Sequence, residues 1–173
     1  MTRRTLISPE RIRARVAELG EELSLFYEGR ELTMVILMNG ALFFGADLAR
    51  AIRAPLRLDS IAVQSYVQDA SSGKLTIRCA PKLDPAGRNI LLADDVLDTG
   101  LTLRDTADWF RAKGAADVRT CVLLDKVFDD PARAKLIHAD WVGFRIPDRY
   151  VIGYGLDSEE AYRNLDRVCV LQN

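Results

Sequence analysis

The chain has 173 residues, of which 49% are hydrophobic and 28% are charged, and its 24 Lys and Arg residues nearly balance its 25 Asp and Glu residues. This composition is typical of one globular domain, here residues 1–173, with a substantial buried core. The near-neutral charge gives no strong field for nucleic acid or an anionic membrane, so we expect neither as a partner. The basic residues 1–4 precede no long apolar run, which argues against a signal peptide or membrane span and favours a cytoplasmic location.

The first half of the chain begins with a predicted helix. Ser8 can cap this helix and Pro9 suits its first position. Apolar residues then recur at helical spacing, at Ile12, Val16, Leu19, Leu23 and Phe26. The next patterns predict a strand over 33–38, a helix over 42–52 and a pair of strands over 56–66 and 75–79. The polar, small-residue tip between the paired strands predicts a mobile lid over about residues 66–74.

The second half alternates short apolar strands with helical segments. Strands are expected over 89–93 and 118–124 with a helix over 102–113 between them, and short strands over 140–144, 150–154 and 168–171. This alternation predicts an α/β fold with a mostly parallel central sheet flanked by helices. Ligands of such sheets lie beyond the carboxyl ends of the strands. Three polar loops leave strand ends there, at residues 39–40, 94–100 and 125–126.

The three cysteines are Cys79, Cys121 and Cys169, and each lies among apolar or β-favouring residues. None forms a Cys-x-x-Cys pair, so we expect buried, reduced thiols and not disulfides or metal ligands. His138 is the only histidine, and it gives no support to a zinc site.

The strongest chemical signal is the segment from Ile90 to Thr102. A buried strand runs into the adjacent carboxylates Asp94 and Asp95, Asp98 follows, and residues 99–102 read Thr-Gly-Leu-Thr before a helix. Adjacent carboxylates repel each other, so a fold tolerates them best where a ligand or a metal uses them. The turn offers backbone N–H groups and hydroxyls at a helix N-terminus, where a phosphate binds well.

The whole segment therefore fits a ribose that carries a 5′-phosphate. It matches neither the Walker P-loop nor the glycine pattern of dinucleotide-binding folds. A solvated loop with a capping threonine is the ordinary alternative, which we would favour for a lone Asp-Asp pair.

This segment resembles the phosphoribosyl-pyrophosphate signature of type I phosphoribosyltransferases. Residues 140–157, reading DWVGFRIPDRYVIGYGLD, and residues 162–165, reading YRNL, are similar to the hypoxanthine–guanine branch of that family. The resemblance extends over nearly the whole chain. It implies a core over about 30–140, a hood from both ends of the chain, and a lid that Ser65 and Tyr66 introduce.

The resemblance also implies the chemistry. The enzyme would act in purine salvage, moving the 5-phosphoribosyl group of phosphoribosyl pyrophosphate to N9 of hypoxanthine or guanine, with Mg²⁺ as cofactor and IMP or GMP and pyrophosphate as products. A homodimer or homotetramer is the implied assembly. Asp98 would be the catalytic residue, beside purine N7.

The remaining roles follow from the same resemblance. Asp94 and Asp95 would hold the ribose hydroxyls and metal-bound water, and Asp157 would bind a second magnesium. Substrate contacts would come from Thr99, Gly100 and Thr102 at the 5′-phosphate, Lys126 at the 6-oxo group, Tyr150 and Val151 at the base, and Arg163, Asn39 and Gly40 at pyrophosphate, with a cis peptide possible between Met38 and Asn39.

Plain structural roles stay open for several of these residues. Lys126 and Arg163 could be surface charges, Tyr150 a core residue and Asp157 a cap of the following turn. The sequence also departs from the family: Asn39 and Leu101 stand where basic residues are common, and Asp94 stands where Glu is common.

Two other functions stay open. The base could be xanthine, or uracil as in bifunctional pyrimidine regulators of this fold. The chain could also be a non-catalytic sensor of phosphoribosyl pyrophosphate that binds nucleic acid, although a sensor needs no general base at Asp98.

Overall fold

The computed structural model describes residues 2–65, 75–130 and 132–172. A large sheet has the strand order β4-β3-β2-β5-β6-β7, and a small sheet has the order β1-β9-β8. In the large sheet β3, β2, β5, β6 and β7 run parallel, and only β4 is antiparallel, on the edge. The predicted mostly parallel α/β fold is confirmed.

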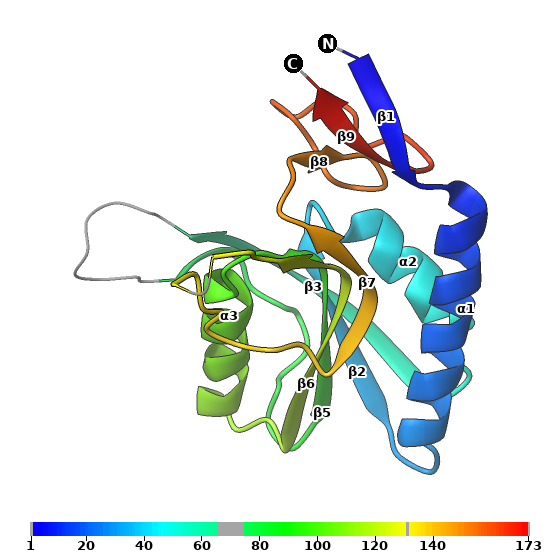
Figure 1. Ribbon diagram of the computed structural model, residues 1–173. Helices are drawn as coiled ribbons and strands as arrows, with labels where there is room; N and C mark the ends of the chain where they lie inside the picture. Colours follow the sequence, from blue (N-terminus) through cyan, green and yellow to red (C-terminus); the bar gives the residue numbers. More distant parts are fainter. Residues whose placement is uncertain (1, 66–74, 131, 173) are drawn as a thin grey trace.

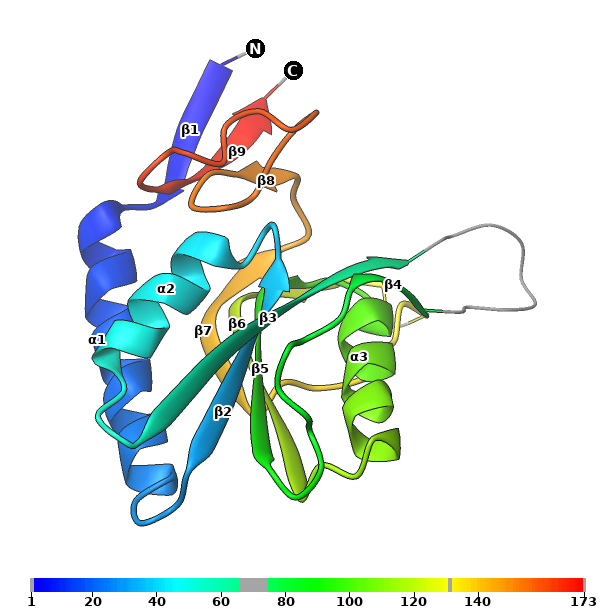
Figure 2. The ribbon, with the colours of Figure 1, turned by 180° about the vertical axis from the view of Figure 1, so that it is seen from behind.

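The large sheet contains β2 (Leu32–Met38), β3 (Leu56–Ser65), β4 (Leu75–Cys79), β5 (Asn89–Leu97), β6 (Asp117–Val127) and β7 (Trp141–Pro147). Helices α1 (Pro9–Phe26) and α2 (Leu42–Ala51) cover one face, and α3 (Leu101–Ala112) covers the other (Figures 1 and 2). Parallel sheets need cover on both faces, which explains the continuous apolar runs of β2 and β5.

Two apolar cores lie on the two faces of this sheet. On one face, the α1 residues Ile12, Leu19 and Leu23 pack with Phe44 of α2. On the other face, Leu103, Ala107 and Phe110 of α3 pack against Leu92 and Val122. The first helix begins as expected: the Ser8 hydroxyl accepts a hydrogen bond from the Arg11 amide at 3.4 Å.

The small sheet joins the two ends of the chain, above the carboxyl edge of the large sheet (Figure 1). It is built from β1 (Thr2–Ile7), β8 (Val151–Ile152) and β9 (Val168–Gln172), and β9 pairs antiparallel with both other strands. We did not predict β1 as a strand, because it has no regular alternation of its own and is fixed by pairing with β9. Among the described residues no helix is both long and apolar enough to span a membrane.

Two expectations about local structure were wrong. Cys79 is exposed and not buried, because it ends the edge strand β4; all three cysteines are free. The strands β5 and β6 also extend beyond the expected ends at residues 93 and 124, to Leu97 and Val127. The polar side chains at 94–95 and 125–126 are therefore held by strand pairing and not by loops. The predicted lid, residues 66–74, lies outside the described residues.

Candidate active site

The polar residues predicted from the sequence gather at the carboxyl edge of the large sheet, under the small sheet. The registers β2–β5 and β5–β6 bring the ends of three strands to this edge, for example Leu97 beside Asp125. Such an edge is the usual ligand site of a parallel sheet.

Asp94 and Asp95 are adjacent, partly buried carboxylates at the end of β5. The Asp94 carboxylate accepts a hydrogen bond from the Asp95 amide at 3.0 Å, and the Asp95 carboxylate accepts one from the Val96 amide at 2.8 Å. Burial, followed by repulsion from Asp95, raises the pKa of Asp94 well above its ordinary value. Burial also raises the pKa of Asp95, against the opposing effects of its hydrogen bonds and of Arg163. The pair is held in an environment that disfavours its full charge.

Asn39 and Gly40 lie at the end of β2, beside this pair. The Met38–Asn39 peptide is cis, as expected from the sequence resemblance. A Cβ atom at Gly40 would overlap the Asp95 carboxylate, and one at Gly155 would overlap the Gly40 carbonyl oxygen. Two glycines thus let the turn after β2, the end of β5 and the loop after β8 come into contact.

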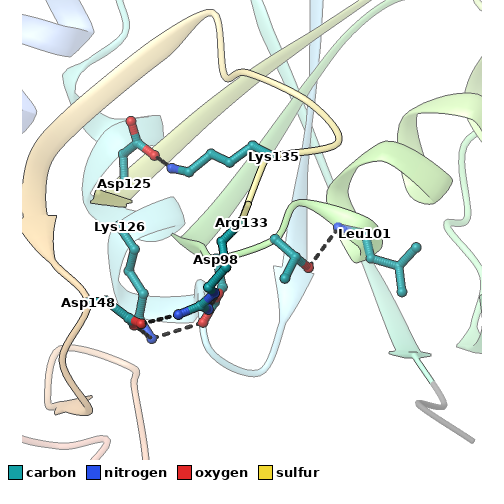
Figure 3. A network of polar contacts seen from close by, with 8 residues as sticks. Asp98, Leu101, Asp125, Lys126, Arg133, Lys135 and Asp148 are labelled. Carbon is teal, nitrogen blue, oxygen red and sulfur yellow. Dashed lines mark hydrogen bonds and ion pairs between the residues drawn. The ribbon is translucent and has the colours of Figure 1, made fainter. Parts of the chain in front are cut away.

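The turn from Asp98 to Thr102 opens α3. Gly100 is the N-cap with φ of 82°, and as a glycine it supplies no side chain to cap the helix. The Leu101 amide, labelled in Figure 3, donates to the Thr99 hydroxyl at 3.4 Å. The Thr99 carbonyl accepts a hydrogen bond from the Leu136 amide at 2.9 Å. Thr102 lies in the first turn, and its carbonyl accepts a bond from the Thr106 hydroxyl. The start of α3 has the form of a phosphate-binding helix N-terminus.

Lys126, from β6, reaches back to the residue that follows β5. Its ammonium donates to Asp98 at 2.9 Å and lies 3.3 Å from the carboxylate of Asp148 (Figure 3). Partial burial alone would lower the pKa of Lys126, but the hydrogen bonds and charges of Asp98 and then Asp148 raise it. The lysine is therefore a charged donor between two carboxylates and not a free surface charge.

Arg133 completes a ring of four charges. It pairs with Asp98 at 3.4 Å and more closely with Asp148, so each carboxylate meets both cations. A second pair, Lys135 with Asp125, lies beside the ring (Figure 3).

The loop after β8 carries Asp157 and Arg163. The Arg163 guanidinium pairs with Asp157 at 2.9 Å and donates to the Gly155 carbonyl at 2.8 Å. Asp157 also accepts a hydrogen bond from the Glu160 amide, so it does cap the turn that follows it. The Tyr154 hydroxyl donates a hydrogen bond to Asp47 of α2 at 2.6 Å. This bond connects the loop to one of the helices that cover the large sheet.

Tyr150 immediately precedes β8, and Val151 is its first residue. Tyr150 is 58% exposed, which excludes a core role for its ring, and its hydroxyl donates to the Asp157 carbonyl at 3.1 Å. Val151 is buried. Ser65 ends β3, opposite Leu75 of β4, whereas Tyr66 lies outside the described residues.

The described residues contain no group of three or more His, Cys, Asp and Glu side chains that could hold a metal ion. The carboxylates at this edge are nevertheless oxygen donors, the ligand type that Mg²⁺ prefers. Mg²⁺ is usually bound by one or two carboxylates together with waters and substrate phosphates, so the residues present fit such an ion.

The comparisons with known proteins agree on one family. A model of the phosphoribosyl transferase domain matches residues 7–159. The hypoxanthine-guanine phosphoribosyltransferase of Bacillus subtilis is 40% identical over 170 residues, covering 98% of this chain and 93% of that protein. The chain belongs to the hypoxanthine–guanine phosphoribosyltransferase family.

Other members of the family differ in their named substrates. The hypoxanthine-guanine-xanthine phosphoribosyltransferase of Tritrichomonas foetus is 36% identical over 169 residues, covering 98% of this chain and 91% of that protein. A solved hypoxanthine-guanine phosphoribosyltransferase of Bacillus anthracis has a TM-score of 0.90 at 34% identity and covers 98% of both chains. The Trypanosoma cruzi hypoxanthine phosphoribosyltransferase in complex with its product IMP has a TM-score of 0.87 at 32% identity, covering 97% of this chain and 93% of that one.

The sequence analysis does not identify two residues of this site, Arg133 and Asp148. Asp148 lies in the C-terminal motif, two positions before Tyr150, so its place in that motif could have indicated it. Arg133 comes from an irregular segment 35 residues after Asp98 in the chain, and no local pattern indicates that the two meet.

The Asp94–Asp95 pair predicts a pH-dependent cost to stability. In the unfolded chain Asp94 ionises as pH rises through about 4, but its folded pKa is higher, so folding loses stability over that interval. Asp94→Asn keeps an oxygen acceptor for the Asp95 amide and removes the repulsion. We expect the variant to have a higher Tm than the wild type at pH 7. Each kcal/mol of unfolding free energy gained should raise the Tm by about 2–4 °C.

Thermal unfolding measured from pH 4 to pH 8 checks this prediction. The Tm difference between Asp94→Asn and the wild type should be small at pH 4 and should increase towards neutral pH. Asp108→Asn, at an exposed position of α3, is the matched control and should show no such growth. A constant or negative difference across the range would contradict the assigned electrostatics.

Proposed function

We propose that this protein transfers the 5-phosphoribosyl group of phosphoribosyl pyrophosphate to N9 of hypoxanthine or guanine, giving IMP or GMP and pyrophosphate in purine salvage. The observation that carries the proposal is the contact of Lys126 with Asp98, next to the N-terminus of α3. In the proposal, Lys126 is the donor for a 6-oxo group, Asp98 the base for a ring proton and the start of α3 the phosphate site, all at one edge of the sheet.

The proposed reaction exchanges one bond at the anomeric carbon. The bond from C1 of the ribose to a pyrophosphate oxygen breaks, the bond from C1 to purine N9 forms, and the purine loses a proton from N7. Asp98 accepts that proton in the proposal, because its carboxylate follows β5 directly and lies beside the lysine that would hold the base.

The 5′-phosphate would bind at the start of α3, where the helix dipole favours negative charge. Its contacts there would be Thr102 and the backbone amides of Thr99, Gly100 and Leu101. Asp94 and Asp95 would accept hydrogen bonds from the ribose hydroxyls. In the proposal these hydrogen bonds would stabilise two carboxylates whose full charge is disfavoured by burial.

Pyrophosphate would meet Asn39, Gly40 and Arg163. Arg163 already has Asp157, Glu160 and the Gly155 carbonyl as partners, so pyrophosphate would exchange with one of them. Tyr150, with an exposed ring, would stack on the base, and the Val151 backbone would meet its far edge.

Magnesium completes the proposal. Asp157, and Asp94 and Asp95 through water, would hold Mg²⁺, which when bound neutralises charge on the leaving pyrophosphate. The cytoplasmic location and the homodimer or homotetramer stay predictions of the family resemblance.

The competing functions differ in their base or in the absence of catalysis. Xanthine is favoured as a further base only by the name of the Tritrichomonas foetus relative. A non-catalytic sensor is disfavoured by the placement of Asp98 against Lys126, an arrangement that donor binding alone does not need.

A steady-state panel tests the function itself. With saturating phosphoribosyl pyrophosphate and Mg²⁺, hypoxanthine or guanine should give the nucleotide and pyrophosphate, and adenine and uracil should be poor substrates. Chelation of the metal should abolish turnover, and Mg²⁺ should restore it. Folded protein that binds the donor but forms no nucleotide from any 6-oxopurine would mean that the protein is a sensor.

Asp98→Asn tests the general base. An amide cannot take the N7 proton, and the loss of a general base typically slows chemistry by about 10²–10⁴-fold. The measurement is the single-turnover rate with enzyme in excess of guanine, together with the Kd of the donor, which should stay near the wild-type value. Asp108→Asn should match the wild type, and an unchanged single-turnover rate in Asp98→Asn would remove Asp98 from this role.

Lys126→Ala tests base choice. An ammonium has only donors, so it suits a 6-oxo group and not the 6-amino group of adenine. A buried partner left unpaired costs about 1–3 kcal/mol, so the variant should lose kcat/KM for guanine and hypoxanthine far more than for adenine.

The ratio of kcat/KM values for guanine and adenine is the decisive quantity. Lys113→Ala, which removes an exposed lysine at the end of α3, should leave this ratio unchanged. If Lys126→Ala lowers kcat/KM equally for all bases, Lys126 does not contact the 6-oxo group and the purine binds elsewhere.

A further inference from the structure

The ring of Lys126, Asp98, Arg133 and Asp148 divides the oxygens of each carboxylate between its two cations. Lys126 takes Oδ2 of Asp98 and Oδ1 of Asp148. Arg133 takes Oδ1 of Asp98 and Oδ2 of Asp148. Either cation can therefore leave without breaking the contacts of the other.

Arg133 has a third partner besides the two carboxylates. Its guanidinium carbon lies 3.9 Å from the centre of the Phe128 ring, within the range of a cation–π contact. One nitrogen of the flat guanidinium meets Asp148 and another meets Asp98 (Figure 3). The ring contact with Phe128 therefore orients the plane that carries both nitrogens. Lys126, in contrast, carries its charge on a flexible four-carbon stem.

The proposed reaction makes different demands on the two cations. Lys126 has three N–H donors and already contacts two carboxylates, those of Asp98 and Asp148. When it turns toward the 6-oxo group of a purine, its hold on Asp98 weakens at the moment when Asp98 must face N7. The Arg133 contact, on the opposite oxygen, does not compete with the base.

We propose that Arg133 is a positioning residue for the general base. Stacked on Phe128 and anchored to Asp148, it holds the carboxylate plane of Asp98 while Lys126 binds the purine. This inference rests on the proposed function, in which Asp98 is the base and Lys126 meets the 6-oxo group.

The ordinary alternative is a surface ion pair with no part in the reaction. The Arg133 side chain is 44% exposed, and exposed ion pairs contribute little to stability. The two possibilities differ in one respect, since only a positioning residue acts through Asp98. A double-mutant cycle therefore separates them.

The experiment measures single-turnover rates for Arg133→Ala, Asp98→Asn and the double variant, and the KM for phosphoribosyl pyrophosphate. Arg133→Ala should slow the chemical step about tenfold, as expected for the loss of a hydrogen bond to a charged group. The donor KM should stay within about twofold, because the donor contacts lie elsewhere. In the Asp98→Asn background the same substitution should change the rate by less than about twofold.

Arg145→Ala is the matched control, because Arg145 is an exposed arginine of β7 that pairs with Asp125 and does not contact Asp98. It should behave as the wild type. Thermal unfolding checks each variant, and if Arg133→Ala is unfolded at the assay temperature, Arg133→Gln replaces it.

Three results would overturn the inference: a wild-type rate in Arg133→Ala, the same tenfold loss in the Asp98→Asn background, or an equal loss in Arg145→Ala. Failure of the proposed function would instead appear in the wild type, as absence of turnover with every 6-oxopurine.

Discussion

The pairing of β5 between β2 and β6 is the constraint on which the site depends. Because the three strands are parallel and in register, their carboxyl ends reach one edge together. Asn39 and Gly40 follow the first strand, Asp94 and Asp95 lie in the second near its carboxyl end, and Lys126 lies in the third. A shift of β5 by one residue would turn its side chains to the opposite face and separate Asp95 from Gly40.

The same edge contains two opposite electrostatic arrangements. The Asp94–Asp95 pair is only partly compensated by its hydrogen bonds and by the charge of Arg163, and burial raises both pKa values. The Asp98–Lys126 ring is balanced, with two carboxylates and two cations in contact. A pair that is only partly compensated gains most from a ligand with hydroxyl donors or a metal ion, whereas each carboxylate of the ring already contacts two cations. The edge therefore contains two distinct electrostatic environments.

Much of this site could be predicted from the sequence, because its residues are close to strands with strong apolar patterns. The run Ile90–Ala93 predicts β5, and the polar residues after it then must lie at the sheet edge. What the sequence could not provide are contacts between segments without a pattern. Arg133 meets Asp98 only through the path of an irregular segment. Likewise, β1 exists as a strand only because β9 pairs with it, and the true ends of β5 and β6 depend on their mutual register.

The small sheet has a consequence for the order of folding. Its central strand, β9, pairs with β1 across a long separation in sequence, with Arg3 opposite Leu171. Closure of such a long-range pair is slow compared with local contacts. The large sheet can therefore form while the loop with Asp157 and Arg163 still lacks its second anchor. A refolding chain would thus complete the carboxylate-rich edge first and hold this loop in place only when β1 and β9 pair.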